Sequence, residues 1–586
     1  MYDRWSLKVL YDSYEDEKFQ SDLKKVDELN ARYNELAESL GQKSEVETIK
    51  EILLLEEEYE VLVHRLYDFC GLAGEADTTD ENASSYLGVL MQKANESTRP
   101  GTILQKYIAK VENIDACIAQ DALLKEYEDR LHRIQADDKY MLGEDVEEAL
   151  SRMDISGGQA WSKLQSYLTS SVKVMFRGEE TTLPGIRNMA YEADPAVRKE
   201  AYEAELACYE QIKDSVAFAL NSIKMQDWST CRMRGHKSPL DKVLYNSRMQ
   251  RATLEALMEA MKEYMPNFHE YLKAKAVALG HKNGLPWYDL FAPMGNSTEK
   301  YSVADAKAFL MKVFNDVNPR MAEIIDRAFE EEWIDFFPRK GKVGGAFCAG
   351  LLGEKQFRIL TNFDGSFSDV VTLAHELGHG YHDFMTHDNR PLNMDYSMPV
   401  AETASTFNEN VVKGYALDHT PNDDEKLAIL EGELSDVTQI ICDIYSRFLF
   451  ESKVVDNRES SFMFADKLCE YMLEAQKEAY GDGLDHEILH PYMWVCKGHY
   501  YSADLGFYNF PYAFGGLFAR GLYAKFRQEG AAFLEKYNLM LKETPVRSVE
   551  DVAKICDIDL TDKEFWLMSL HSYDEDIAEF KRLTAK

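Results

Sequence analysis

The sequence predicts a mainly α-helical protein with a small β-sheet. Apolar residues recur at three- and four-residue spacing in long stretches, for example at Leu23, Val26, Leu29, Tyr33 and Leu36, which is the period of a helix with one buried face. Strand patterns occur only near residues 172–184 and 356–361. The chain has 586 residues, of which 45% are hydrophobic and 29% charged, so it is long enough for several folded units.

We expect three regions along the chain. Residues 1–110 form a helical hairpin region, in which a helix near residues 14–40 and a second over Glu47–Tyr67 pack antiparallel. A coiled-coil module is disfavoured because the apolar stripe is not sustained over enough heptads. Residues 111–190 form a helical domain that ends in a short β-hairpin. A long helix begins at Asp194-Pro195, and residues 191–586 form the third domain, which contains the functional motif described below.

Composition and charge exclude several classes of partner. A net charge of −36 repels nucleic acid and anionic membranes, and no apolar run reaches the roughly 18 residues of a membrane span. The nine cysteines are scattered without a Cys-x-x-Cys pair, which indicates free thiols in a reducing compartment. No signal-peptide pattern is recognisable, so we expect a cytoplasmic protein; its oligomeric state is left open.

The strongest functional signal is His375-Glu376-Leu-Gly-His379. On a helix, residues at i and i+4 share one face, so His375 and His379 can bind one metal ion. Glu376 lies beside them and can take a proton from a metal-bound water, as in a zinc hydrolase. Ser366-x-x-Asp369 predicts a capped start for this helix.

A second copy of the motif, His486-Glu487-Ile-Leu-His490, is disfavoured. Glycines precede it, and Pro491 biases His490 away from helical backbone angles. The first copy is flanked by apolar residues that can pack its helix firmly. We therefore interpret the second copy as a loop or helix end with hydrogen-bonding histidines.

A carboxylate is the best candidate for the third ligand that a catalytic zinc requires. Met385 stands where a third histidine of the metzincin pattern would lie. His382 is too far along the helix to share the ion, and we expect it to be a core or supporting histidine. Glu402, early in a helix that Ser397 can cap, fits better. Glu409 lies seven residues later on the same face, either as an acceptor for a ligand histidine or as a solvated carboxylate.

A stretch rich in Tyr and Gly supplies candidates for transition-state stabilisation. It runs from His499-Tyr500-Tyr501 to Tyr508 and Tyr512. Peptide hydrolysis develops negative charge on the carbonyl oxygen, which His and Tyr donors can stabilise. Which tyrosine donates is left open.

These motifs together resemble the oligoendopeptidase F branch of the thimet oligopeptidase family of zinc peptidases. The resemblance covers His375–His382, Val400–Glu409, the segments 345–348 and 357–363, and His499–Gly515, and it extends to Ser156–Trp161. It implies a two-lobed helical zincin with a deep central channel and cleavage of short peptides. It also implies one zinc per chain on His375, His379 and Glu402, with Glu376 as general base and His499 and Tyr512 as oxyanion donors.

Two other functions remain as alternatives. A ferritin-like di-iron oxidase needs Glu-x-x-His twice, which Glu376/His379 and Glu487/His490 formally supply, but it leaves His375 without a role. A non-catalytic peptide-binding protein with a vestigial site is disfavoured because Glu376 is intact. In the peptidase interpretation, the strand at Phe357–Thr361 can pair with the substrate backbone.

Overall fold

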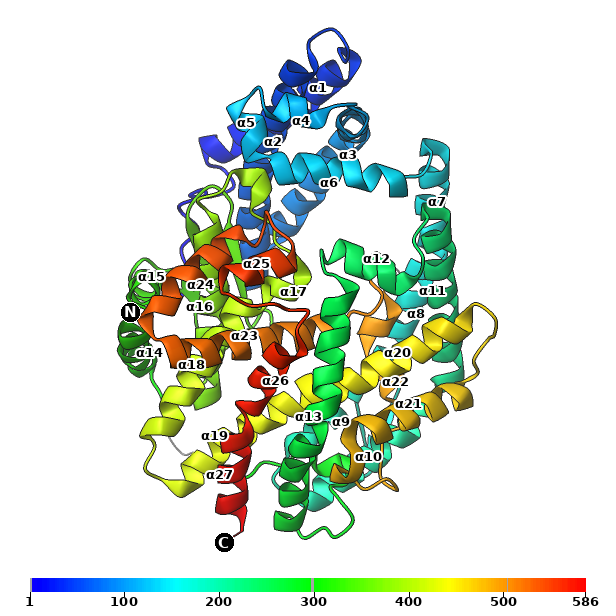
Figure 1. The fold of residues 1–586 in the computed structure, drawn as a ribbon, viewed down its shortest axis with the longest axis vertical. Coiled ribbons are helices and arrows are strands. Elements are labelled where there is room, and N and C mark those ends of the chain that lie inside the picture. The colour runs from blue at the N-terminus through cyan, green and yellow to red at the C-terminus, as the bar shows by residue number, and fades with distance from the viewer. Residues whose placement is uncertain (1–2, 297–299, 503, 586) are drawn as a thin grey trace.

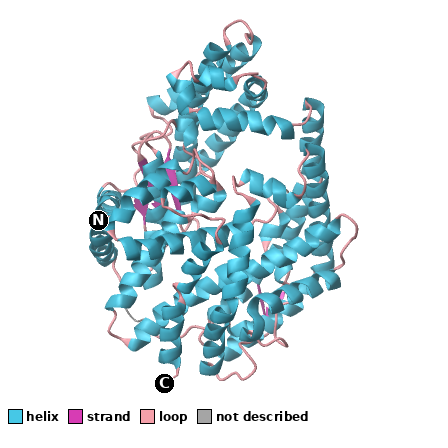
Figure 2. Cartoon of the chain, viewed as in Figure 1, coloured by secondary structure: helices cyan, strands magenta, loops and turns pink. Residues whose placement is uncertain are grey.

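The computed structural model describes residues 3–296, 300–502 and 504–585, and this part of the chain is mostly helical with two small sheets (Figure 2). The predicted mainly α-helical class is confirmed. No helix among the described residues is long and apolar enough to cross a membrane.

The N-terminal helices form a lobe with its own hydrophobic core (Figure 1, top). Its long helices α1, α2 and α3 pack against one another, so a third helix joins the two that the apolar pattern predicts. The core residues lie between Leu10 and Leu131, and Leu351, from much later in the chain, joins them. The helices are α1 (Glu17–Glu38), α2 (Glu45–Ala76), α3 (Glu81–Ala109), α4 (Ile114–Ile118), α5 (Ala122–Glu126) and α6 (Glu128–Asp137).

A second helical group follows, and its hydrophobic core continues to the end of the chain. The predicted hairpin is confirmed as β1 (Val174–Phe176) and β2 (Glu179–Thr181), paired antiparallel with Val174 opposite Thr181. Asp194 caps α10, where the sequence predicts a helix start. The helices are α7 (Glu144–Ser156), α8 (Gly158–Ser171), α9 (Leu183–Asn188), α10 (Pro195–Tyr209), α11 (Lys213–Arg234), α12 (Pro239–Asn246), α13 (Arg251–Ala278), α14 (Val303–Val317) and α15 (Pro319–Glu330).

The remaining helices complete this larger body around one continuous core, from Val174 to Leu583. The expected domain limits at residues 110 and 190 stay a prediction. The helices are α16 (Phe367–Thr386), α17 (Met398–Ala401), α18 (Thr403–His419), α19 (Asp423–Thr438), α20 (Ile444–Arg458), α21 (Ala465–Tyr480), α22 (Met493–Cys496), α23 (Phe510–Glu529), α24 (Ala531–Glu543), α25 (Val549–Ile555), α26 (Lys563–His571) and α27 (Asp574–Thr584).

A three-stranded sheet lies beside α16. Its order is β3 (Ile334–Asp335), β5 (Gln356–Leu360), β4 (Phe347–Leu351), with β5 parallel to β3 and antiparallel to β4. The predicted strand at 356–361 is confirmed, but the expectation that it pairs with substrate is wrong because β5 is the central strand. Only an edge strand has backbone groups that are free to pair with a substrate. β4 is an edge strand, and Ala346, the residue before it, lines the cavity described below.

Helix α16 begins and packs as its sequence predicts. The Ser366 side chain accepts from the Asp369 amide while the Asp369 carboxylate accepts from the Ser366 amide, which completes the predicted capping box. Gly378 and Gly380 have no side chain, so α18 and β5 can approach α16 closely at these two positions. A Cβ at Gly378 would lie 2.5 Å from the Cα of Ser405 on α18, and one at Gly380 would lie 2.6 Å from the Phe357 ring on β5. The two glycines thus let α16 pack tightly against both elements.

The close contact at Gly378 makes a testable prediction. In Gly378→Ala, the new methyl group meets the backbone of α18, which cannot rotate away, so the helices must separate. We expect a loss of unfolding free energy of about 1–3 kcal/mol, measured by thermal or urea unfolding. Gly88→Ala on α3 is the matched control, because no atom lies within 4 Å of its Cβ position; we expect it to be neutral or stabilising. Equal stability of the two variants would contradict this account of the packing.

Candidate metal and active site

Helices α16 and α18 bring the three predicted ligands together. The Nε2 atoms of His375 and His379 lie 3.1 Å apart. Glu402 Oε2 lies 3.4 Å from Nε2 of His375 and 3.3 Å from Nε2 of His379. Among the described residues, these three are the group of His, Cys, Asp and Glu side chains whose ligand atoms converge in this way.

The spacing of these atoms fits a tetrahedral metal ion. Zinc bound tetrahedrally at about 2.0–2.2 Å holds neighbouring ligand atoms about 3.3–3.6 Å apart, close to the three distances above. A cation placed between the three atoms could be bound by all of them. Nitrogen and carboxylate oxygen donors are the set that zinc takes in catalytic sites.

Glu402 lies at the junction between two helices, α17 and α18, rather than inside a helix. The sequence predicts one helix that Ser397 caps, but the chain forms α17, then α18 with Glu402 as its N-cap, and Ser397 makes no side-chain cap bond. Ser405 donates to Glu402 Oε2 at 2.9 Å, which orients the carboxylate. Burial disfavours the charged form, but hydrogen bonding and charge from His379 outweigh it and lower the pKa of Glu402 to about 2.

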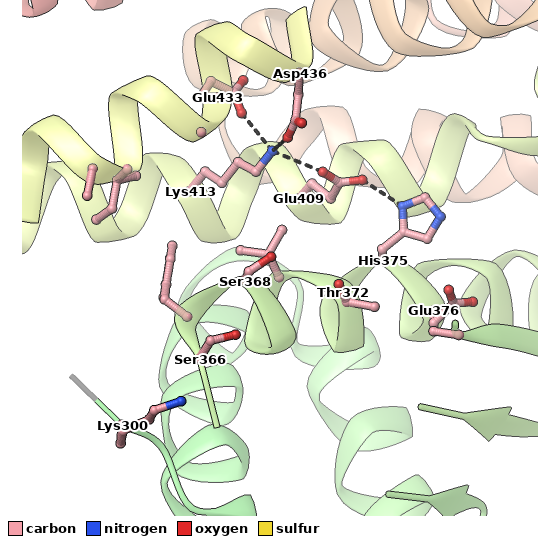
Figure 3. Close-up of a pocket in the computed structure, with 16 residues that line it drawn as sticks. Lys300, Ser366, Ser368, Thr372, His375, Glu376, Glu409, Lys413, Glu433 and Asp436 are labelled. Carbon is pink, nitrogen blue, oxygen red and sulfur yellow. Dashed lines mark hydrogen bonds and ion pairs between the residues drawn. The ribbon is translucent and has the colours of Figure 1, made fainter. Parts of the chain in front are cut away.

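Glu409 acts as the expected acceptor and not as a solvated carboxylate (Figure 3). Its Oε1 lies 2.6 Å from Nδ1 of His375, so the opposite ring nitrogen, Nε2, is free to bind metal. Lys413, one turn further along α18, contacts Glu409 at 3.1 Å, Glu433 at 2.8 Å and Asp436 at 3.3 Å. Burial disfavours charged Glu409, but the Lys413 ammonium and the hydrogen bond and charge of His375 together outweigh it and lower the pKa of Glu409 to about 2.

Lys413 is a supporting residue that the sequence reasoning missed. Its position four residues after Glu409 is a helix-face signal, but Glu433 and Asp436 come from α19, and no local pattern predicts that contact. The lysine neutralises part of a cluster of carboxylates that would otherwise repel one another. It therefore fixes the carboxylate that orients His375.

Glu376 lines a cavity of about 630 Å³ beside His375. The side chain is 6% exposed, and no described group forms a hydrogen bond or ion pair with its carboxylate. Burial raises the pKa of Glu376, which makes it a stronger base than an exposed glutamate. The cavity passes along α16 to α18 and α19, so a peptide there would lie against the catalytic face of α16.

His382 and the second motif lie outside this site. His382 is fully buried, stacks on Tyr396 with ring centroids 4.0 Å apart, and approaches Thr544 Oγ1 at 2.8 Å; burial lowers its pKa to about 3. Residues 486–490 are not helical, as expected from Pro491. His490 is buried 3.3 Å from Glu205, so it forms no second half of a di-iron site with Glu376 and His379.

The structure separates the four candidate tyrosines into two pairs. Tyr500 and Tyr501 are fully buried, and the Tyr501 hydroxyl donates to the carbonyl of Trp494, so both serve the core. Tyr508 and Tyr512 surround His499, with ring centroids 5.2 Å and 5.7 Å from the imidazole. Tyr512 is 39% exposed, and burial of the rest of its side chain raises its pKa to about 12.

Helix α23 places this Tyr/His group close to the metal ligands. A Cβ at Gly515, one turn after Tyr512, would lie 3.1 Å from Cβ of Glu402. The Tyr508 hydroxyl approaches Sδ of Met398 on α17 at 3.9 Å. The structure therefore brings the segments of the predicted donors and of the predicted ligands close together, although they come from distant parts of the chain.

Comparison with known proteins matches this site to a family. The model described as "Peptidase family M3" matches residues 188–572, which include every residue of the site. The chain belongs to peptidase family M3. A second model, "Oligopeptidase F", matches residues 110–173. The resemblance to oligoendopeptidase F is thus confirmed, and the M3 chain is a metallo-oligopeptidase.

Curated relatives of this M3 peptidase cover its whole length. It is 24% identical to oligopeptidase PepF of Bacillus subtilis, over 100% of this chain and 88% of the relative. An oligoendopeptidase F homolog of Borreliella burgdorferi is 22% identical, over 99% of this chain and 98% of the relative.

Solved structures share the fold. Oligoendopeptidase-F of Enterococcus faecium aligns with a TM-score of 0.70 at 17% identity, over 97% of this chain and 98% of that one. A peptidase structure from Chlamydophila abortus aligns with a TM-score of 0.85 at 20% identity, over 99% of this chain and 98% of that one.

Proposed function

We propose that this M3 peptidase is a zinc endopeptidase that hydrolyses internal bonds of short oligopeptides. The observation that carries the proposal is the convergence of His375, His379 and Glu402 at tetrahedral ligand spacing. The neighbouring Glu376 carboxylate has no hydrogen-bond or ion-pair partner among the described residues. One zinc per chain, held by these three residues, would polarise the scissile carbonyl and lower the pKa of a water to about 7. The names of the relatives, oligopeptidase and oligoendopeptidase, support short peptides as substrates.

The chain's own residues would then carry out the proton transfers. Glu376 takes a proton from the attacking water and passes it to the leaving amine, as a general base and then a general acid. Glu409 orients His375, and Lys413 holds Glu409 in place. The outer edge of β4 can add the substrate backbone as an extra strand.

His499, Tyr512 and Tyr508 are the proposed donors to the developing oxyanion. Burial lowers the pKa of His499, which keeps the ring neutral and able to donate one N–H near neutral pH. Tyr512 is the principal hydroxyl donor because it is the more exposed of the two tyrosines and lies one turn before the residue that contacts Glu402.

Removal of one hydroxyl tests the donor assignment. We expect Tyr512→Phe to lower kcat by about 10²–10³-fold, the usual cost of one oxyanion donor, with little change in KM. Tyr501→Phe is the control, since its hydroxyl bonds to Trp494 in the core and its loss should lower stability more than kcat. If both variants keep wild-type kcat, another group stabilises the oxyanion.

The proposal as a whole is tested with peptides of graded length. We expect internal cleavage of short fluorogenic peptides, loss of cleavage with a chelator, recovery with zinc, and no cleavage of a folded protein. A di-iron oxidase would hold two irons and cleave nothing, and a peptide-binding protein would bind these peptides without turnover. We also propose a cytoplasmic location, with no nucleic-acid or membrane partner; the oligomeric state is not part of the proposal.

A further inference from the structure

The catalytic cavity contains an acidic group, Glu409, Glu433 and Asp436, of which the proposed mechanism uses only Glu409. Glu433 and Asp436 lie three residues apart on α19 and line the cavity together with Glu409 of α18 (Figure 3). Glu376 lines the same cavity; its side chain is 6% exposed, and its carboxylate has no hydrogen-bond or ion-pair partner among the described residues. A buried polar group that faces a cavity without a partner indicates that the cavity receives a ligand.

The acidic group carries more negative than positive charge. Lys413 lies at its centre, 3.1 Å from Glu409, 2.8 Å from Glu433 and 3.3 Å from Asp436, so three carboxylates share one ammonium group. His375 gives Glu409 an N–H but, as a metal ligand, no charge. Burial raises the pKa of Asp436, and the charges of Glu433 and Glu409 add to the rise, although Lys413 opposes it. A further cation beside Asp436 would relieve this repulsion.

The other cations near the cavity do not compensate the acidic group. Arg520 approaches Glu433 at 3.6 Å but lies closer to Asp576, at 2.9 Å, so this pair adds no net charge. Lys300 lines the cavity near the start of α16, away from the acidic group (Figure 3), and is paired with Asp364 at 3.2 Å. The cavity is therefore negative at the end that α18 and α19 form.

Asp436 is accessible from the cavity. Its side chain is 69% exposed. Gly432, one turn earlier on α19, also lines the cavity, and no atom lies within 4 Å of the position of its Cβ. The cavity wall also contains the apolar side chains of Phe367, Val371 and Ile429. The aliphatic part of a lysine or arginine packs on such side chains while its charged end reaches a polar group.

A metal ion is a poor occupant for this end of the cavity. Among the described residues, the His, Cys, Asp and Glu side chains whose ligand atoms converge are the three proposed zinc ligands, and Glu433 and Asp436 are not among them. Both carboxylates instead contact the ammonium group of Lys413. A second ammonium or a guanidinium group suits this arrangement, because it binds carboxylates through several directed N–H bonds.

We propose that Asp436 and Glu433 bind the side chain of a lysine or arginine in the peptide substrate. The basic residue would lie near the cleaved bond, because the acidic group contacts His375 through Glu409 and shares a cavity with Glu376. The inference rests on the proposed peptidase function and adds to it a substrate class, short peptides with a basic residue close to the cleaved bond. The net charge of −36 would favour the approach of such peptides.

The test compares the cleavage of paired peptides that differ at one residue. Each peptide is N-acetylated and C-amidated and carries lysine or glutamine at successive positions around the cleaved bond. At one position we expect kcat/KM to be about tenfold higher with lysine, the effect of one hydrogen bond between charged groups, and added salt should reduce this ratio. Equal cleavage at every position would overturn the proposal. An equal gain from a free N-terminus on the glutamine peptide would assign the acidic group to a terminal amine and also overturn it.

Variants at Asp436 test which residue produces the preference. The lysine-to-glutamine ratio is measured within each variant, so that a general loss of activity cancels. Asp436→Asn should lower the ratio, and Asp436→Lys should invert the preference, so that a glutamate peptide is cleaved faster than the lysine peptide. Asp316→Asn, at an exposed aspartate on α14 that does not line the cavity, is the control and should keep the ratio. A wild-type ratio in Asp436→Lys, with a wild-type thermal melt, would overturn the proposal.

Peptide binding separates this inference from the proposed peptidase function. If no peptide is cleaved, the peptidase proposal fails, and fluorescence anisotropy with the same peptides still decides the acidic site. Wild-type protein should bind the lysine peptide more tightly than the glutamine peptide, and Asp436→Lys should remove the difference; equal affinities for wild type would overturn the inference. Cleavage without any preference for lysine would overturn the inference and leave the peptidase proposal intact.

Discussion

Glu376→Gln is expected to lower kcat by about 10²–10⁴-fold, the usual contribution of a general acid–base group, while the protein keeps its metal. The amide retains the size and polarity of the carboxylate but cannot accept a proton. Glu376 is not one of the three converging ligands, so metal affinity should stay within the error of measurement. Because no described group bonds to the Glu376 carboxylate, the substitution also breaks no contact that supports the fold.

The measurement combines steady-state kinetics on a short peptide with metal analysis of the same sample. The chain contains its own matched control, Glu487→Gln, which changes the glutamate of the second His-Glu-x-x-His copy. Glu487 is exposed in a loop and is not one of the three converging ligands, so its substitution should leave kcat unchanged. Near-normal turnover of Glu376→Gln would exclude Glu376 as the base. A loss of metal in that variant would instead indicate that Glu376 is a ligand.

The local parts of this site follow from sequence because they depend on neighbours in the chain. The Ser366–Asp369 capping box, the i, i+4 spacing of His375 and His379, and the helix-breaking effect of Pro491 are all properties of a few consecutive residues. The same is true of the β-hairpin after residue 172. These features also predict that the first copy of the motif lies on a helix and the second does not, as the structure has them.

The remaining parts depend on tertiary packing, which local patterns do not encode. The break at Glu402 arises where α18 packs on α16 and α23 over small residues, Gly378 and Gly515. The order of the sheet decides that β4, and not β5, is the edge. Burial alone separates Tyr500 and Tyr501 from Tyr508 and Tyr512. Lys413 becomes interpretable only when α19 brings Glu433 and Asp436 to it.

Glu402→Ala should remove stable metal binding, and with it activity at any practical zinc concentration. The substitution leaves two nitrogen donors from one helix and removes the only anionic ligand of the set. Glu409→Ala is the informative comparison, because it removes the partner of His375 Nδ1 without removing a ligand. Loss of such an outer partner typically weakens metal affinity or activity by about 10–100-fold, so we expect its activity to return when zinc is added.

The two variants therefore differ in a way that a zinc titration can measure. Competition with a chromogenic chelator should rank zinc affinity as wild type, then Glu409→Ala, then Glu402→Ala. Since Lys413 loses one of its three carboxylate contacts in Glu409→Ala, some loss of stability is expected there, and a thermal melt at saturating zinc separates that effect from affinity. If Glu402→Ala binds zinc as tightly as Glu409→Ala, a different group completes the site. If adding zinc rescues neither variant, Glu409 does more than orient His375.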